Sequence, residues 1–313
     1  MECKTFWVPC CDSHWKRKAK QKFMSQNYKM IIQYEGTRYD GWQKQGNTEN
    51  TIQGRMEKVL ERMAGFPVEV HGSGRTDAGV HAEGQVANFH LPDGWHVPDA
   101  KDSFRLVSGK HLPEADGQKR PANGQQKSAA WICDYLNRYL PDDIAVTELV
   151  PVPERFHSRL SAVRKIYTYR VDTAKKRNVF SRRTVYGLGE ELNLEAIGRA
   201  AALLCGTHDY KSFCGNKKMK KSTVRTIYRI EVKKKPGSSL VELEFEGNGF
   251  LQNMVRILTG TLIEVGLGKR DAASMPDILK AMDRQAAGYT APAEGLCLSE
   301  VFYGFYCTRI GIF

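Results

Sequence analysis

The chain has 313 residues, and its 47 Lys and Arg against 35 Asp and Glu give a formal net charge of +12 at pH 7. With 41% hydrophobic and 26% charged residues, the composition is that of an ordinary globular protein, which excludes collagen-like repeats, a coiled coil and a disordered chain. The basic surplus favours a polyanionic partner, and a membrane surface, DNA and RNA all remain open.

The sequence shows no pattern typical of export or membrane insertion. It has no run of about 18 apolar residues, and the basic cluster near the N-terminus follows the few apolar residues there, unlike a secretory signal. Eight scattered cysteines do not form a disulfide framework, so we expect a cytoplasmic protein. Residues 1–26 are interpreted as a basic N-terminal extension. Zinc binding by its cysteines and histidine is disfavoured because they lack paired CxxC spacing; these residues are Cys3, Cys10, Cys11 and His14.

Hydrophobic periodicity predicts a first half in the order β-α-β-β-α-β. Its first helix has one apolar stripe, which includes Ile52, Met56 and Leu60, and Thr51 can cap it. The predicted elements, in chain order, are a strand near 27–34, a helix at about 51–64, strands at 67–71 and 85–90, a helix near 128–140 and a strand near 144–150.

After Pro151 and Pro153 the same order recurs. The predicted elements are a strand at 164–171, a helix at 191–205, strands at 224–234 and 239–246, helices at 250–266 and about 276–287, and a strand near 300–306.

The repeated order predicts an α+β fold of two ferredoxin-like halves that share a mainly antiparallel sheet. The N-terminal half covers residues 27–153 and the C-terminal half covers 154–313. Residues of about 92–127, rich in Pro, Gly, Asp, Lys and Gln, are interpreted as an insertion.

The most unusual local sequence is the glycine-rich loop 71–81, HGSGRTDAGVH, between two predicted strands. It is neither a dinucleotide fingerprint, because Asp77 replaces the third glycine, nor a Walker A loop. One interpretation is a hairpin loop with turn hydrogen bonds. The other is a rigidly held carboxylate, Asp77, which the nearby Arg75 would keep ionised as a nucleophile or base.

Several blocks of the chain resemble the tRNA pseudouridine synthase A family. The loop segment GRTDAGVHAEGQVANF closely resembles the family signature. Further blocks follow in the same order between about residues 27 and 307: YEGTRYDGWQ, LPDDIAV, ERFHSRLSAVRKIYTYR, NGFLQNMVRILTG and AEGLCL.

The resemblance implies the fold, the reaction and the partners. It implies two ferredoxin-like halves around a shared sheet, and conversion of uridine to pseudouridine at positions 38 to 40 of the tRNA anticodon stem-loop. It also implies that no metal or organic cofactor takes part and that a homodimer holds the tRNA. A ribosomal RNA stem-loop as target, or a catalytically inactive RNA-binding protein on the same scaffold, are the alternatives.

The resemblance also implies roles for residues at matching positions. Asp77 matches the catalytic aspartate, and Arg256 would pair with it. Tyr167 matches the tyrosine that packs on the target base and is a candidate for removing the C5 proton, although strand periodicity alone fits Tyr169 equally well. Arg75 matches the arginine that displaces the target base from its stack.

Other residues are expected to contact the RNA. Leu296 and Leu298 could pack against the uracil, and His157 and Arg159 are expected on the RNA side. Basic side chains in two runs are candidates for phosphate contacts: Lys175, Lys176 and Arg177, and Lys217, Lys218, Lys220 and Lys221. Glu35 and Cys297 depart from the family, which commonly has Asp and an aromatic residue there.

Overall fold

The computed structural model describes residues 25–93, 95, 124–176, 178–234 and 236–304. The candidate zinc ligands, the N-terminal extension up to residue 24 and most of the 92–127 segment lie outside these residues. Arg177 lies outside them as well. Among the described residues, no helix is long and apolar enough to cross a membrane.

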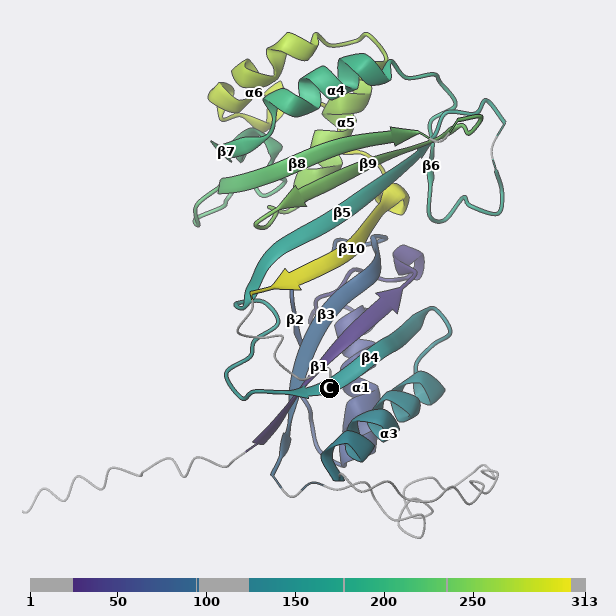
Figure 1. Cartoon of the computed structure of the whole chain (residues 1–313), viewed down its shortest axis with the longest axis vertical. Helices are drawn as coiled ribbons and strands as arrows, with labels where there is room; N and C mark the ends of the chain where they lie inside the picture. The colour runs from purple at the N-terminus through teal and green to yellow at the C-terminus, as the bar shows by residue number, and fades with distance from the viewer. Residues whose placement is uncertain (1–24, 94, 96–123, 177, 235, 305–313) are drawn as a thin grey trace, which may run out of the picture.

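A ten-stranded, mainly antiparallel sheet runs through both halves of the chain. Figure 1 shows the halves stacked along the long axis, with α1 and α3 in the lower half and α4, α5 and α6 in the upper half. The main path of the sheet is β4-β1-β3-β10-β5-β9-β8-β7, and β2 and β6 pair off this path with β3 and β5. The halves meet where β3 pairs in parallel with β10.

The first half contains four strands and two helices in the expected order. They are β1 (Ser25–Tyr34), α1 (Ile52–Ala64), β2 (His71–Gly72), β3 (His81–Pro92), α3 (Gly124–Tyr139) and β4 (Ile144–Val152). The apolar stripe of α1 packs on alternate side chains of β1, and Ile52, Met56, Met30 and Ile32 are all buried. The Thr51 hydroxyl caps α1 by accepting from the Gly54 N–H at 3.2 Å.

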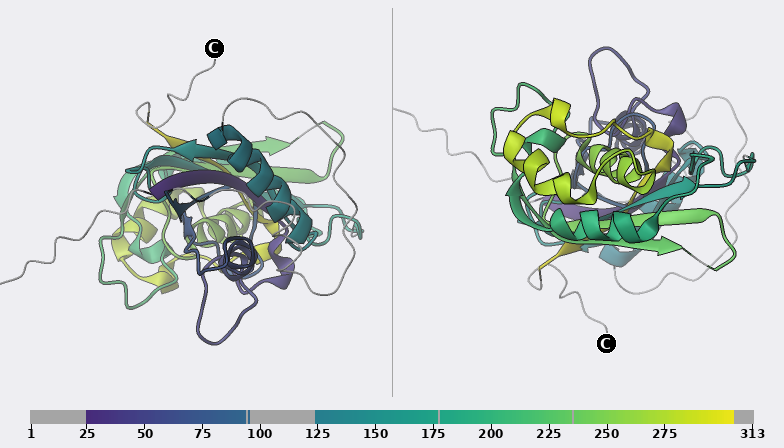
Figure 2. Two further views of the ribbon diagram at one scale, coloured as in Figure 1. Left: turned by 90° about the horizontal axis from the view of Figure 1, so that it is seen from below. Right: turned by 90° about the horizontal axis from the view of Figure 1, so that it is seen from above.

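The second half repeats the order with additions. It contains β5 (Ala162–Asp172), β6 (Tyr186–Gly187), α4 (Leu194–Leu203), β7 (Gly206–Asp209), β8 (Val224–Lys234), β9 (Leu240–Gly247), α5 (Met254–Gly266), α6 (Met275–Ala281) and β10 (Leu296–Tyr303). Helix α5 is buried along nearly its whole length. Figure 2 shows α1 from below and α5 from above, each nearly end-on, so both helices run along the long axis.

The predicted strand at 67–71 is wrong except for its last residue, since β2 spans only His71–Gly72. The backbone before it bonds to side chains of α1 instead of to a neighbouring strand. The Val70 N–H donates to Glu57 Oε1 at 3.2 Å, and Gln53 Nε2 donates to the Val70 carbonyl at 3.1 Å. The alternating apolar residues of this segment, Val68 and Val70, are therefore buried against a helix and do not form a strand.

Further boundaries differ from the predicted ones; β3, for example, begins at His81, four residues before the predicted start at 85. Helix α5 begins at Met254 because Asn253 has a positive φ of 58°, outside the helical region. Helix α6 ends at Ala281, where Met282 adopts a φ of 51°. Strand β10 begins at Leu296, four residues earlier than expected, because Leu296 and Leu298 pair with β5.

Candidate active site

The 71–81 loop connects β2 to β3 and is fixed by contacts with the segment that follows β1. The Tyr34 hydroxyl and Thr76 Oγ1 lie 2.8 Å apart, and the Trp42 N–H donates to the Thr76 carbonyl at 3.1 Å. A side chain at Gly72 would place its Cβ 2.4 Å from the Trp42 ring, so only glycine permits this packing. The loop therefore presents Asp77 from a rigid frame.

Asp77 is half-buried and lies at the start of α5. Burial raises its pKa above the ordinary value, while the charge of Arg256 and a hydrogen bond from the Asn253 N–H lower it. The N-terminal end of a helix favours a negative charge, so α5 stabilises the ionised carboxylate. The sequence led us to expect that nearby positive charge would favour the ionised carboxylate. The Asp77 pKa is nevertheless raised, because desolvation is the largest of these effects.

Arg256 projects from the first turn of α5 toward the same region. Its Nε donates to the Ala291 carbonyl at 2.7 Å, and its Nη1 donates to Asn253 Oδ1 at 3.1 Å. No ion pair within 4.0 Å joins it to Asp77 in the described part of the chain. Arg256 therefore acts on Asp77 by proximity of charge while its guanidinium is anchored elsewhere.

Tyr167 on β5 faces this carboxylate. It is 8% exposed, and its ring meets Phe250 edge-on with centroids 5.3 Å apart. Burial, followed by the proximity of Tyr34 and Asp77, raises its pKa. Tyr169, on the same face of β5, is fully buried and its hydroxyl donates to the Pro292 carbonyl at 2.7 Å. The packing thus separates the two tyrosines: Tyr169 belongs to the core and Tyr167 to the site.

The neighbouring strand β10 supplies apolar side chains to this region. Leu298 pairs with Tyr167, and Leu296 pairs with Tyr169. Both leucines are buried and, as cross-strand partners, lie beside the tyrosines on the same face of the sheet. Cys297 faces the opposite side of the sheet, because successive side chains alternate. Burial raises the pKa of its thiol to about 12.

Arg75, His157 and Arg159 lie together on the outer side of the loop. They line a cavity of 210 Å³ next to Gly72 and Gly74. Arg75 is exposed and its Nε donates to Gln43 Oε1 at 3.0 Å. The structure therefore gathers these sequence-predicted RNA contacts around one cavity, from the loop and from the segment before β5.

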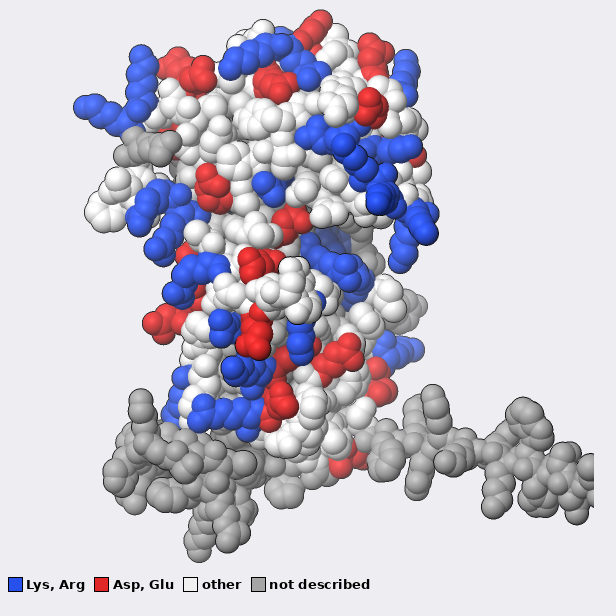
Figure 3. All heavy atoms as spheres, turned by 180° about the vertical axis from the view of Figure 1, so that it is seen from behind, with Lys and Arg blue, Asp and Glu red and all other residues white. Residues whose placement is uncertain are grey.

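The lysine runs are exposed at two more distant loops. Lys175 and Lys176 follow β5, and a second run precedes β8; its members are Lys217, Lys218, Lys220 and Lys221. Within the described residues none of these lysines is part of an ion pair. Figure 3, which shows the molecule from behind, shows Lys and Arg side chains gathered along both sides of its upper half.

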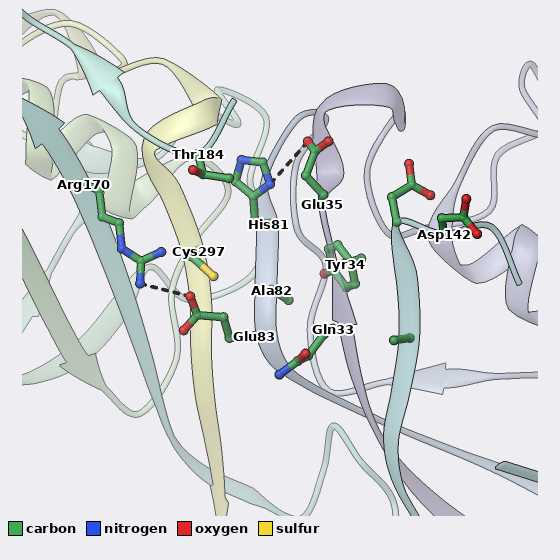
Figure 4. A pocket seen from close by; sticks show the side chains of 12 residues that line it. Gln33, Tyr34, Glu35, His81, Ala82, Glu83, Asp142, Arg170, Thr184 and Cys297 are labelled. Atoms are coloured by element: carbon green, nitrogen blue, oxygen red, sulfur yellow. Dashed lines mark hydrogen bonds and ion pairs between the residues drawn. The ribbon is translucent and has the colours of Figure 1, made fainter. Parts of the chain in front are cut away.

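A second cavity, of 290 Å³, lies where the two halves meet (Figure 4). His81 lines this cavity. Its Nδ1 accepts from the Gly36 N–H at 3.0 Å, and its Nε2 lies 3.1 Å from the Glu294 carbonyl. Burial lowers the pKa of His81. Glu83 and Arg170 form an ion pair at 3.0 Å across the same cavity. Because these lining groups bond to one another, we interpret them as structural contacts that hold the end of the 71–81 loop in place.

Sequence reasoning missed two residues of the site. Tyr34 anchors the loop, and its only sequence signal was its place in the YEGTRYDGWQ block. Asn253 contributes its N–H to Asp77, and an Asn directly before an apolar helical run is a helix-start signal. No cluster of His, Cys, Asp or Glu that could hold a metal ion is found in the part of the chain that the structure describes.

Comparison with known proteins gives a consistent match. The family model described as tRNA pseudouridine synthase matches residues 30–160 and 200–304. A tRNA pseudouridine synthase A from Bacillus sp. (strain KSM-64) is 41% identical over 277 residues, which cover 88% of this chain and 99% of the relative. The protein of the same name from Geobacillus kaustophilus is 42% identical over 285 residues, covering 91% and 97%.

The matched regions contain the elements that converge on Asp77: the 71–81 loop, the N-terminal end of α5 and strand β10. The whole of β5, with Tyr167, falls between the two segments of the family model, but the relatives align over nearly their whole length. On the combined match, the chain belongs to the tRNA pseudouridine synthase family.

Proposed function

We propose that this protein is an isomerase that converts uridine to pseudouridine in tRNA. The observation that carries the proposal is the placement of Asp77: a half-buried carboxylate at the N-terminal end of α5, between Arg256 and the buried Tyr167. RNA binding alone requires no carboxylate facing a polyanion, whereas the isomerisation does. The names of the relatives support the same reaction.

The reaction breaks the N1–C1′ glycosidic bond, turns the uracil and forms a C5–C1′ bond. Atoms and electrons balance within the nucleotide, so no co-reactant is needed. Ionised Asp77 would initiate it, by attack on C1′ of the sugar, by attack on C6 of the base or by deprotonating C2′. The charge of Arg256 and the Asn253 N–H support the ionised form that each of these steps requires.

The surroundings of Tyr167 favour packing on the target base over action as a base. Its raised pKa keeps the phenol protonated at neutral pH. A ring held edge-on by Phe250 beside Leu298 offers a flat apolar wall for the uracil. Removal of the C5 proton by Tyr167 would require the phenolate, which burial disfavours.

We assign to Arg75 the role of occupying the gap left by a displaced base. It is exposed on the loop two residues before Asp77, so it can enter a helix while the uridine reaches the carboxylate. Base flipping costs a few kcal/mol, and a uridine at the end of a stem reduces that cost. Positions 38 to 40 of the anticodon stem-loop satisfy this condition, and a ribosomal RNA stem-loop of similar shape is the alternative target.

We also infer that the two halves, 27–153 and 154–313, are copies of one ferredoxin-like unit. The strand order supports this: β4-β1-β3 with β2 attached in the first half corresponds to β10-β5-β9-β8 in the second. The tRNA substrate points to the cytoplasm. A homodimer that holds one tRNA across both subunits completes the proposal, and the mass of the protein in solution tests it: a monomer at micromolar concentration would refute the dimer.

The test of the activity is Asp77→Asn. We expect this variant to bind tRNA with unchanged affinity and to form no pseudouridine in a map of total RNA from cells that carry it. Because burial raises the Asp77 pKa, ionised Asp77 destabilises the fold above that pKa, and the variant should be at least as stable as the wild type.

The matched control is Asp277→Asn, an exposed carboxylate in the first turn of α6. It should modify the same uridines as the wild type. Pseudouridine formation by Asp77→Asn at the wild-type rate would refute the assignment. The positions that the map shows to depend on Asp77 distinguish tRNA from ribosomal RNA.

A further inference from the structure

Four basic side chains from two separate segments meet on the outer side of the 71–81 loop. We name them the loop-side cluster: His71, His157, Arg159 and Lys165. The rings of His71 and His157 stack with centroids 5.2 Å apart, and the Arg159 N–H donates to His157 Nδ1 at 3.1 Å. Three of them line the 210 Å³ cavity, and Lys165 lies against its Gly74 wall.

Lys165 is the deepest member of the cluster. It lies on β5 two residues before Tyr167, so both side chains point to the same face of the sheet. Its Nζ donates to the Ser73 carbonyl at 2.7 Å. A Cβ on Gly74 would lie 2.9 Å from this Nζ, so the absence of a side chain at Gly74 admits the ammonium group. One of its three N–H donors is thus used by the loop, which leaves two for a ligand.

Within the described residues, neither Lys165 nor Arg159 forms an ion pair within 4.0 Å, so their positive charges are uncompensated. Burial, and then the proximity of Arg159, lowers the pKa of Lys165 to about 8. Burial, His71, Arg159 and His90 likewise lower the pKa of His157. Among the described residues, the one carboxylate within 4.0 Å of a basic nitrogen of the cluster is that of Glu69, which is largely exposed and lies 3.7 Å from His71.

The strands packed on either side of Lys165 supply no counter-charge. Its partners are Gly247 on β9 and Val301 on β10. On the loop, Arg75 is a further cation that lines the same cavity. Like charges held together in a half-buried site without a partner destabilise the free protein, and a bound anion would relieve this repulsion.

We propose that the loop-side cluster, led by Lys165 and Arg159, binds a backbone phosphate of the RNA beside the target uridine. The inference rests on the proposed function and adds a site for the phosphodiester to it. A phosphate oxygen accepts charge-assisted hydrogen bonds from an ammonium and a guanidinium. Because the same Nζ bonds Ser73, a phosphate held there would be in fixed register with Asp77, four residues along the loop.

The test uses tRNA binding by Lys165→Met and Arg159→Ala, measured as Kd over a range of salt concentrations. We expect Kd to rise about tenfold for each, and the slope of log Kd against log salt to fall by about one, as for loss of a single phosphate contact. Lys280→Met, which removes an exposed lysine of α6, is the control and should leave both unchanged.

The pH dependence separates the phosphate site from a purely structural role. Lys165 loses its proton as pH rises through about 8, so wild-type binding should weaken between pH 7 and 9. Lys165→Arg keeps its charge throughout this range and should bind with little change. A variant that loses turnover while Kd and the salt slope stay at wild-type values would show that Lys165 only fixes the loop, and would overturn the proposal.

A stem-loop RNA identifies the phosphate. A neutral methylphosphonate at one linkage next to the target uridine should weaken wild-type binding, and the same change should cost the double variant Lys165→Met/Arg159→Ala nothing further. If every methylphosphonate RNA weakened binding by the variant as much as it weakens binding by the wild type, the result would contradict the site. These are binding measurements, so failure of the wild type to form pseudouridine in this RNA would count against the proposed function and not against the cluster.

Discussion

Two opposing effects meet at the carboxylate of Asp77. Desolvation favours the protonated form, while Arg256 and the Asn253 N–H favour the ionised form, and desolvation is the larger. When ionised, a carboxylate held in this way is poorly solvated, which makes it more reactive as a nucleophile or a base than an exposed aspartate. Arg256 is anchored by the Ala291 carbonyl, so its charge stays near Asp77 without neutralising it in a direct ion pair.

Replacing Arg256 should shift the pH profile in a defined direction. In Arg256→Gln the lowering effect on the Asp77 pKa is lost, so the acid limb of kcat should move to higher pH. We expect kcat at pH 7 to fall by about 100-fold, the scale seen when one charge-stabilising donor is removed. Single-turnover rates measured across a range of pH give both the position of the acid limb and the fall in rate at pH 7.

Arg270→Gln is the control, because this arginine pairs with Glu264 at 2.9 Å at the other end of the helix. Its pH profile should match that of the wild type. An acid limb that stays in place in Arg256→Gln would show that Arg256 does not set the ionisation of Asp77.

At the scale of elements, α5 is the part that brings the site together. Its first turn holds Asn253 and Arg256, and its middle packs against the segment before β10. A Cβ on Gly260 would lie 2.0 Å from the Tyr289 carbonyl oxygen, so glycine is required for this approach. The same segment supplies the Ala291 carbonyl that anchors Arg256. Close packing at Gly260 therefore determines where the guanidinium lies.

Gly260→Ala should disturb both stability and activity. The added methyl meets backbone, so α5 must move, and we expect the free energy of unfolding to fall by roughly 1–3 kcal/mol. Turnover should fall with it because the anchor of Arg256 shifts. Denaturant unfolding and single-turnover kinetics on the same preparation measure the two effects.

Gly198→Ala in α4 is the matched control. Nothing lies within 4 Å of its added Cβ, and alanine is the better helix former, so this variant should gain about 0.5–1 kcal/mol. Equal effects of the two substitutions would contradict the role given to Gly260.

At the scale of the whole molecule, the net charge is distributed unevenly. On the sheet, basic and acidic side chains are paired: Arg164 with Glu246 at 2.8 Å, and Lys233 with Glu244 at 3.1 Å. The lysines before β8 and after β5 are exposed, and none of them forms an ion pair within the described residues. These two groups of unpaired lysines therefore lie in loops that can follow an RNA backbone.

Binding of tRNA should depend strongly on salt. With about six to ten phosphate contacts, affinity would fall by roughly 10³–10⁵ between 50 and 200 mM salt. Changing four lysines to Gln should lower the slope of log Kd against log salt by about one for each phosphate contact removed. These lysines are Lys217, Lys218, Lys220 and Lys221.

The double change of Lys58 and Lys280 to Gln, on the outer surfaces of α1 and α6, should leave the slope at the wild-type value. A flat salt response of the wild type would contradict binding dominated by the RNA backbone.

The order of elements was predictable from the sequence because burial of one face imposes periodicity. The stripe of α1 and the strands β8 and β9 were placed within about one residue. Predictions failed where a side chain replaced a backbone partner or a residue took an unusual conformation. Val70 bonds to Glu57 instead of to a strand, and Asn253 delays the start of α5.

The candidate residues also divide by what local pattern can show. Asp77 and Arg75 stood out because an acidic residue and an arginine within a glycine-rich loop are locally unusual. Tyr167 and Tyr169 were equivalent by periodicity, and the hydrogen bond from Tyr169 to Pro292 and the proximity of Tyr167 to Asp77 separate them. Lys165 has no local signal, because its role depends on the distance to Ser73, 92 residues away in the chain.

The sequence by itself determined the family, the succession of strands and helices and the identity of the carboxylate, because these depend on residue types and their spacing. Only the tertiary structure decided how strongly Asp77 is desolvated, which tyrosine faces it and which cations surround the loop. These properties arise from contacts between segments far apart in the chain. Burial and charge act through distance in space, and spacing along the sequence does not fix that distance.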